Sequence, residues 1–275
     1  MGARLLGEAD LPLVLDLVGA DPVLNVYIAS RVDAGVLSPS SPGQLWGYPA
    51  PAPRSLLHVG TNLVPLATDA EARRAFVELL GPYRPFVAIV GLTAEVRELA
   101  ALLAARWGGS FARPRAVRER QPVLAATSRC PSAPDPRVQR IGRTHLDAYF
   151  AASVAMYREE LEEDPLATNA AGYRNYIAGL VESGRAYGVL SGDRVVFKAD
   201  IGAVGGSVAQ VQGVWIDPEL RGRGLAAPAM AAVTAAILDS GRTASLYVND
   251  FNTAAIATYR RCGYVEYGVF TTVLF

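Results

Sequence analysis

The sequence of 275 residues predicts a mixed α/β (α+β) fold, in which helices flank a central, mostly antiparallel sheet. Two observations lead to this prediction. Three strand-like runs, 186–191, 194–204 and 207–217, follow one another with only glycine-containing turns between them. Two segments with the apolar spacing of amphipathic helices, 145–162 and 171–183, precede these runs.

The rest of the second half continues the alternation of helices and strands. A helix is expected to follow the segment Arg221–Gly224 and to run to about Ser240. A strand at 244–249 and a helix at 252–263 come next. The last twelve residues, YVEYGVFTTVLF, are expected to form a closing strand or strand pair.

The first half repeats this order more faintly. Its expected elements are a helical region near 10–34, a strand-like run at 55–66, a helix at 69–80, a strand at 85–90, a helix at 93–106 and a strand-like end at 115–126. The stretch Ser38–Pro53 is expected to be a loop. The stretch Cys130–Pro136 holds three prolines in seven residues and predicts a linker. We therefore expect two domains, 1–129 and 137–275, the first a degenerate copy of the second.

Composition excludes several function classes. The chain has 26 basic and 26 acidic residues, so it has no general attraction to nucleic acid or to an anionic membrane. No apolar run is long enough to span a bilayer, and Glu8, Asp10 and Asp16 interrupt any signal-peptide core. Two cysteines and two histidines do not provide a zinc site with the usual spacing, so no metal is expected. We expect a soluble cytoplasmic protein, and the excess of arginine over a single lysine indicates a bacterial source.

The stretch DPELRGRGLAAPAM, Asp217–Met230, carries the strongest functional signal. Glycine is a poor helix former, yet Gly222 and Gly224 stand directly before a helical run. The first amides of a helix have no internal partner, and the helix dipole places partial positive charge there. Glycines let an anion approach this backbone closely, and the neighbouring Arg221 and Arg223 add charge. The segment therefore predicts an anion site, although it matches neither the P-loop nor the Rossmann fingerprint.

At this point the chain resembles the GNAT superfamily of N-acetyltransferases. The acetyl-CoA motif Q/R-x-x-G-x-G/A is matched by the residues from Arg221 to Ala226, with the sequence RGRGLA. The downstream motif N-x-x-A-x-x-x-Y-x-x-x-G-[FY] is matched by Asn252, Ala255, Tyr259, Gly263 and Tyr264. The resemblance covers residues 137–275 and extends to bacterial two-part acetyltransferases with a divergent first half. For residues 1–129 it implies a GNAT-like fold without a cofactor loop, two such halves in tandem, and one CoA per chain.

The resemblance also implies roles for particular residues. The backbone of Trp215 and Ile216 would bind the pantetheine arm, Asn252 would contact the cofactor arm, and Tyr259 would protonate the departing CoA thiolate. The pyrophosphate would be held by the six motif residues Arg221, Gly222, Arg223, Gly224, Leu225 and Ala226. Pro228 departs from the family within the first turns of the helix. It is expected to remove an amide that would normally be bonded inside the helix.

The general base is the least defined part of the predicted site. Attack of an amine on a thioester requires a neutral amine, so a carboxylate or a water chain usually removes a proton. Family members often carry a glutamate on the strand before the loop, where this chain has Gln210 and Gln212. The remaining candidates are Glu159, Glu160 and Asp200.

Several of these residues also have ordinary structural interpretations. The run EELEED, Glu159–Asp164, is either a solvated helix end or an acidic rim for a cationic amine. Tyr259 is either an acid catalyst or a packing residue of its helix, and Cys262 is not favoured as a nucleophile. Lys198 is either an acetylation target or, preferably, a strand-edge lysine.

We therefore expect an N-acetyltransferase that moves an acetyl group from acetyl-CoA to a primary amine by direct attack. The alternative is a non-catalytic acyl-CoA-binding or regulatory module. The expected partner is a small-molecule or peptide amine, and the chain is expected to be a monomer with an internal pseudo-dimer or a homodimer.

Overall fold

The computed structural model describes residues 2–275, apart from the side chain of Thr168, and divides the chain into two compact units. Unit 1 contains the residues up to Val123 together with Tyr247–Asn252 and Glu266–Phe275. Unit 2 contains Leu124–Leu246 and Thr253–Val265. The last strand of the chain thus groups with the first part of the sequence, and the predicted domain limits at the proline-rich linker stay a prediction.

Unit 1 holds one mixed sheet in the order β1-β2-β3-β4-β5-β12-β6. Its strands are β1 (Arg4–Leu5), β2 (Gln44–Tyr48), β3 (Ser55–Val59), β4 (Asn62–Leu66), β5 (Ala88–Leu92), the first part of β6 (Ala116–Ala126) and β12 (Val265–Leu274). The neighbours β1 to β4 pair antiparallel, as do β5 and β12. β4 and β5 pair in parallel.

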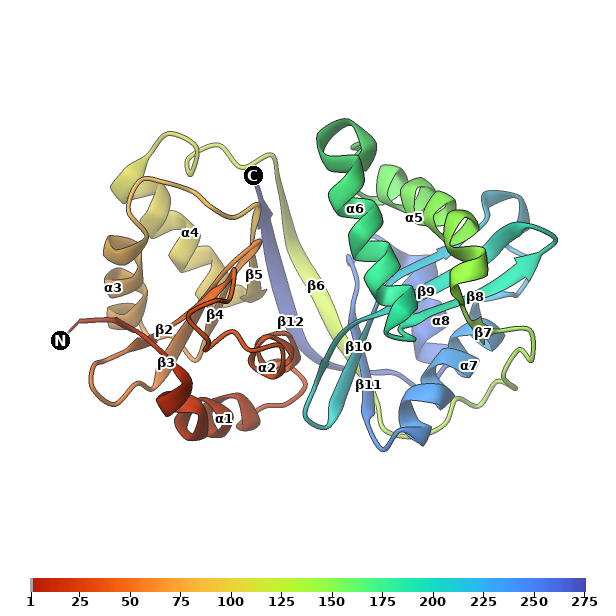
Figure 1. Ribbon diagram of the computed structural model, residues 1–275, viewed down its shortest axis with the longest axis horizontal. Helices are drawn as coiled ribbons and strands as arrows, with labels where there is room; N and C mark the ends of the chain where they lie inside the picture. Colours follow the sequence, from red (N-terminus) through yellow and green to blue (C-terminus); the bar gives the residue numbers. More distant parts are fainter. Residues whose placement is uncertain (1) are drawn as a thin grey trace. The chain divides into compact units, whose positions relative to one another are not determined.

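Helices cover both faces of the unit 1 sheet (Figure 1). They are the short helix η1 (Glu8–Asp10), α1 (Leu11–Gly19), α2 (Val26–Asp33), α3 (Ala70–Leu80) and α4 (Thr93–Trp107). Side chains alternate across a strand, so Leu56 packs with the core under α1 and α2, and the neighbouring Leu57 with the core under α3 and α4. Both leucines are fully buried.

Unit 2 holds the strands β11-β10-β9-β8-β7 in this order. They are β7 (Gln139–Arg140), β8 (Ala186–Ser191), β9 (Arg194–Gly205), β10 (Val208–Ile216) and β11 (Thr243–Tyr247). Each strand from β7 to β9 pairs antiparallel with the next strand along the chain, and β11 pairs in parallel with β10. The predicted mostly antiparallel sheet flanked by helices is confirmed.

The α-helices of unit 2 form two pairs, α5–α6 and α7–α8. The helices of this unit are η2 (Arg143–His145), α5 (Leu146–Leu161), α6 (Pro165–Glu182), η3 (Pro218–Leu220), α7 (Ala226–Asp239) and α8 (Thr253–Arg261). The α5–α6 pair packs against the sheet through a core that includes Tyr149, Ile177 and Trp215. In Figure 1, α7 and α8 lie side by side behind this sheet. None of the described helices is long and apolar enough to cross a membrane.

Several element limits differ from the prediction for local reasons. The predicted loop Ser38–Pro53 contains β2, whose buried Leu45 and Tyr48 the flanking prolines and glycines obscured. The predicted run 55–66 is a hairpin that turns at Gly60–Thr61. The expected single region near 10–34 is two helices, α1 and α2.

The helix predicted at 171–183 begins earlier, at Pro165, where the carboxylate of Asp164 accepts a hydrogen bond from the N–H of Leu166. Asn169 leaves helical geometry within α6, and its side chain accepts a hydrogen bond from the N–H of Gly172 at 2.8 Å. This second cap explains why the sequence pattern indicates a helix only after that point.

Candidate functional site

Two neighbouring strands of unit 2 are paired at one end only. β10 and β11 pair in parallel from Val208 opposite Thr243 to Gln210 opposite Ser245. β10 then continues to Ile216. The parallel pairing ends at Gln210, the third of the nine residues of β10, and the rest of this strand leads through η3 to the glycine-rich loop.

The second part of β10 also contains a β-bulge. Gln212 pairs with Asp200 and Trp215 pairs with Lys198, so three steps along β10 lie opposite two steps along β9. Gly213, inside this interval, has a φ of +57°. The bulge therefore changes the direction of the peptide groups just before the loop.

The loop after β10 exposes backbone at the start of α7. Gly222 and Gly224 have φ values of +73° and +77°, and a Cβ atom at either position would meet no heavy atom within 4 Å. α7 begins at Ala226, and no side chain caps it through a hydrogen bond. Open space, positive φ and uncapped amides are features that an anion-binding loop requires, and they occur where the sequence predicts an anion site.

Pro228 has a different effect from the expected one. α7 begins at Ala226, so Pro228 is its third residue, and the N–H that it lacks is one that has no partner inside a helix. The first bond of the helix runs from the N–H of Ala229 to the carbonyl of Leu225 at 3.2 Å. The proline therefore removes one possible anion donor and breaks no bond of the helix.

Two arginines of the loop have different surroundings. Arg221 donates two hydrogen bonds of 2.6 Å to the carboxylate of Glu159 on α5 and one of 3.0 Å to the carbonyl of Ile216. Arg223 is exposed and makes no ion pair with the residues that the structure describes. Arg221 thus ties the loop to the end of α5, and Arg223 is the guanidinium available to an incoming anion.

Glu159 has the surroundings of an ion-pair partner and not of a base. The hydrogen bonds from Arg221 hold the pKa of the Glu159 carboxyl below its usual value, although partial burial opposes this effect. The indole N–H of Trp215 donates a further hydrogen bond to this carboxylate at 3.3 Å. A carboxylate with a lowered pKa is a weak proton acceptor.

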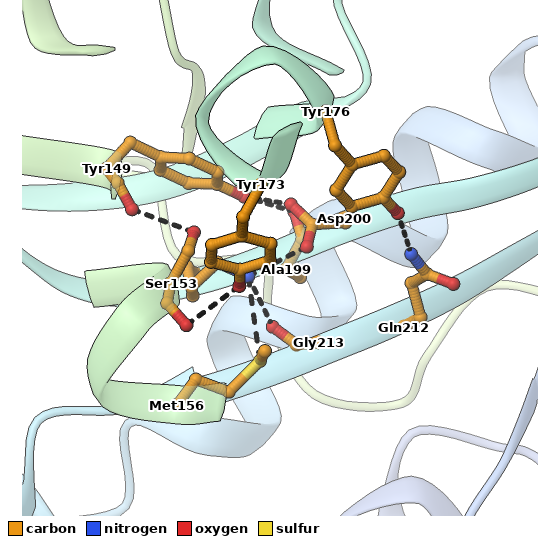
Figure 2. A network of polar contacts seen from close by, with 10 residues as sticks. Tyr149, Ser153, Met156, Tyr173, Tyr176, Ala199, Asp200, Gln212 and Gly213 are labelled. Carbon is orange, nitrogen blue, oxygen red and sulfur yellow. Dashed lines mark hydrogen bonds and ion pairs between the residues drawn. The ribbon is translucent and has the colours of Figure 1, made fainter. Parts of the chain in front are cut away.

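Asp200 belongs to a buried polar network between α5 and the sheet (Figure 2). One carboxylate oxygen accepts a hydrogen bond from the hydroxyl of Tyr149 at 2.5 Å, and the other accepts one from the Lys198 ammonium at 2.7 Å. The expectation that Lys198 is a strand-edge lysine is wrong, because its side chain is fully buried on an inner strand. Asp200 is thus already engaged by two donors.

Tyr259 lies on α8 with only 7% of its surface exposed. Burial raises the pKa of its hydroxyl well above the usual value, and the charge of Glu160 raises it further. Burial also raises the pKa of Tyr173 on α6, with Glu160 among the acidic groups that add to the shift. Of the three candidate bases, Glu160 is the one whose charge acts on Tyr259.

The remaining predicted residues stand at the beginnings of the helices α7 and α8 in the sequence. Leu225 is the residue before α7 and Ala226 is its first residue. Asn252 directly precedes α8 but is grouped with unit 1, and its backbone N–H donates to the carbonyl of Asn249 at 3.0 Å. The described residues contain no group of three or more His, Cys, Asp or Glu side chains that could hold a metal ion.

Sequence reasoning considered Lys198 only as an acetylation target or a strand-edge lysine, and it gave Gly213 no role. The one available signal was that Lys198 is the single lysine beside 25 arginines. Gly213 had no signal of its own, because a glycine in a strand-like run does not reveal which side chains lie against it.

The fold of the chain is that of solved GNAT proteins. An acetyltransferase from the GNAT family of Colwellia psychrerythraea is similar over 100% of both chains, with 12% identity and a TM-score of 0.61. A tandem GNAT protein from the clavulanic acid biosynthesis pathway is similar over 99% of this chain and 98% of that one, with 12% identity and a TM-score of 0.58. A Drosophila malonogaster protein gives a TM-score of 0.67 at 13% identity, over 99% of this chain and 98% of the other. At such identities the likeness concerns the fold alone.

Two family models match the chain over ranges that overlap at residues 135–149. Residues 135–264 match the acetyltransferase (GNAT) family, and residues 43–149 match a domain of unknown function, DUF4081. No curated protein matches the chain. The second half of the chain therefore carries a domain of the GNAT acetyltransferase family, as the motifs around Arg221 and Tyr259 predicted.

Proposed function

We propose that unit 2 is an N-acetyltransferase that moves the acetyl group of acetyl-CoA to a primary amine by direct attack. The observation that carries the proposal is the open loop from Gly222 to Gly224 at the uncapped start of α7. Its exposed backbone and the guanidinium of Arg223 fit a pyrophosphate, since helix N-termini and arginine favour phosphate groups. The GNAT family match over residues 135–264 supports the same donor.

The residues that would bind the donor follow from this placement. The amides from Gly222 to Ala227 would hold the pyrophosphate, and the part of β10 that continues beyond its pairing with β11, up to Ile216, would bind the pantetheine arm. The amide of Val214, in the bulge, would donate to the thioester oxygen and to the oxyanion that develops there. Arg221 would act on the loop through its bonds to Glu159 and Ile216.

The proton transfers would involve Glu160 and Tyr259. Glu160 is the proposed base for the attacking amine, because its charge acts on the hydroxyl of Tyr259, the proposed acid, whereas the lowered pKa of Glu159 makes that carboxylate a weak proton acceptor. As the amine nitrogen bonds to the carbonyl carbon, its proton passes to the base. The carbon–sulfur bond then breaks, and the hydroxyl of Tyr259 gives a proton to the CoA thiolate. The raised pKa of Tyr259 keeps that proton in place at neutral pH.

A non-catalytic acyl-CoA-binding module is the second candidate. It is favoured by Gln210 and Gln212 on β10, which cannot act as bases at neutral pH, and by the ion pairs of Glu159 and Asp200. The two candidates are separated by incubating the protein with acetyl-CoA and a panel of amines and measuring free CoA with a thiol reagent. Amine-dependent release supports the enzyme, and tight CoA binding without release on any amine supports the binding module.

A further inference from the structure

The bulge of β10 lies directly against a buried ion pair. A Cβ atom at Gly213 would lie 2.7 Å from the Asp200 carboxylate, 3.0 Å from the Lys198 nitrogen and 3.1 Å from the Met156 sulfur. Only glycine allows this approach, and the φ of +57° independently favours glycine. The bulge is therefore packed onto the charged pair, with no side chain between them.

Lys198 makes contact with the backbone of the bulge. Its ammonium donates to the carbonyl of Gly213 at 3.0 Å and to Asp200 at 2.7 Å, and its third neighbour is the sulfur of Met156 at 3.7 Å. Three N–H groups thus face three acceptors. A planar guanidinium with five donors does not fit these partners, which explains why this buried position holds the one lysine beside 25 arginines.

The contact with Gly213 affects the next amide along the chain. The carbonyl of Gly213 and the N–H of Val214 belong to one trans peptide group and point in opposite directions. While the carbonyl points to Lys198, the N–H points away from it. A charged donor on the carbonyl also polarises the peptide group and makes its N–H a stronger donor.

The geometry points to Lys198 as a positioning residue, which fixes and polarises the Gly213–Val214 peptide group so that its N–H binds the thioester oxygen of the acyl donor. This inference rests on the proposed function and adds a residue that lies outside the acetyl-CoA motif at Arg221–Ala226 and the downstream motif at Asn252–Tyr264. Asp200 and Tyr149 act behind it: the Tyr149 hydroxyl donates to one Asp200 oxygen, and the other oxygen accepts from Lys198 (Figure 2).

The stability of the fold alone does not explain why the chain has the buried ion pair of Lys198 and Asp200. Replacing both members of a buried ion pair by apolar groups is often neutral or stabilising, whereas removing one member leaves an uncompensated charge. The double variant Lys198→Met/Asp200→Ala therefore folds, with thermal stability close to that of the wild type. The single variant Lys198→Met is the less stable of the two.

The test compares two ligands that differ at the carbonyl. Calorimetry measures the affinities of acetyl-CoA and of S-ethyl-CoA, which has no carbonyl oxygen, for the wild type and for both variants. One hydrogen bond corresponds to an affinity difference of about fivefold to tenfold, so the wild type binds acetyl-CoA more tightly by about that factor. In both variants this ratio falls toward one, while the affinity for S-ethyl-CoA stays within about twofold.

Infrared spectra of bound [1-¹³C]acetyl-CoA provide the second readout. Hydrogen bonding lowers the carbonyl stretching frequency, so the band of the wild-type complex lies below that of the free thioester and returns toward it in the variants. An unchanged ratio or band in either variant overturns the inference, and so does a double variant that does not fold. If the wild type binds neither ligand, the proposed function itself is wrong.

Discussion

A methyl group placed at Gly224 separates the role of the loop from its stability. Gly224 and Gly241 have nearly equal φ values, +77° and +76°, and a Cβ at either position meets no heavy atom within 4 Å. Gly241 follows the other end of α7, a helix of 14 residues and thus about 21 Å long. Gly241→Ala is therefore a matched control for Gly224→Ala.

Both substitutions have the same expected effect on folding. An alanine in left-handed conformation costs about 1–2 kcal/mol, and no steric term is added at these positions. For a chain of this size, each kcal/mol lowers Tm by about 2–4 °C, so both variants melt about 2–8 °C below the wild type.

Only the Gly224 variant is expected to lose affinity for CoA. Its methyl group would enter the space proposed for the pyrophosphate and displace at least one charge-assisted hydrogen bond, worth about 1.5–3 kcal/mol. That corresponds to a loss of about 10-fold to 100-fold in calorimetry with CoA, and Gly224→Glu abolishes binding because it adds a carboxylate. Equal losses in Gly224→Ala and Gly241→Ala, or no loss in either, would refute the placement of the pyrophosphate.

Three further predictions concern the reaction and the number of sites. Tyr259→Phe lowers turnover by about 10²-fold with little change in Tm or CoA affinity. Because burial raises the pKa of the Tyr259 hydroxyl, deprotonation of this group does not reduce the turnover of the wild type up to pH 10. If turnover is unaltered in Tyr259→Phe where chemistry limits the rate, Tyr259 is a packing residue. Glu160→Gln lowers turnover by about 10²-fold or more, whereas Glu159→Gln, the matched control on the same turn, keeps most of the wild-type turnover. Glu159→Gln loses less than about 1 kcal/mol of stability, since its ion pair is half exposed. If steady-state kinetics show the larger loss of turnover in Glu159→Gln, Glu159 is the base. In a titration, the protein is saturated at one CoA per chain, because the start of α3 in unit 1 is already capped by the carboxylate of Asp69, which accepts from the N–H of Ala72 at 2.8 Å. Saturation at two CoA per chain would show a second site.

The sequence predicted the elements whose signals are local. The three strands at 186–191, 194–204 and 207–217 agree with β8, β9 and β10 to within one residue at each end, because glycine turns separate them. The loop from Arg221 to Ala226 was found because glycines are poor helix formers and seldom stand directly before an apolar helical run unless a partner must approach the backbone closely.

Contacts between distant residues could not be predicted in this way. The bonds from Lys198 to Gly213 and from Arg221 to Glu159 join residues 15 and 62 positions apart. Charge alone does not say which of 25 arginines meets which carboxylate, so the choice among Glu159, Glu160 and Asp200 required the fold. The grouping of β12 with unit 1 likewise depends on which strand it pairs with, and its apolar pattern does not specify β5.

The central claim, that the domain moves an acetyl group directly from acetyl-CoA to an amine, is tested by following a labelled acetyl group. The protein is incubated with [1-¹³C]acetyl-CoA and an amine that supports CoA release, the reaction is quenched, and mass spectrometry measures the label on the amine and on the intact protein. We predict that acetylated amine and free CoA form in equal amounts, that Gly224→Glu abolishes both, and that no labelled protein, at Cys262 or elsewhere, accumulates as an intermediate. CoA binding without any acetylated amine, or label that passes through the protein before it reaches the amine, would contradict the account.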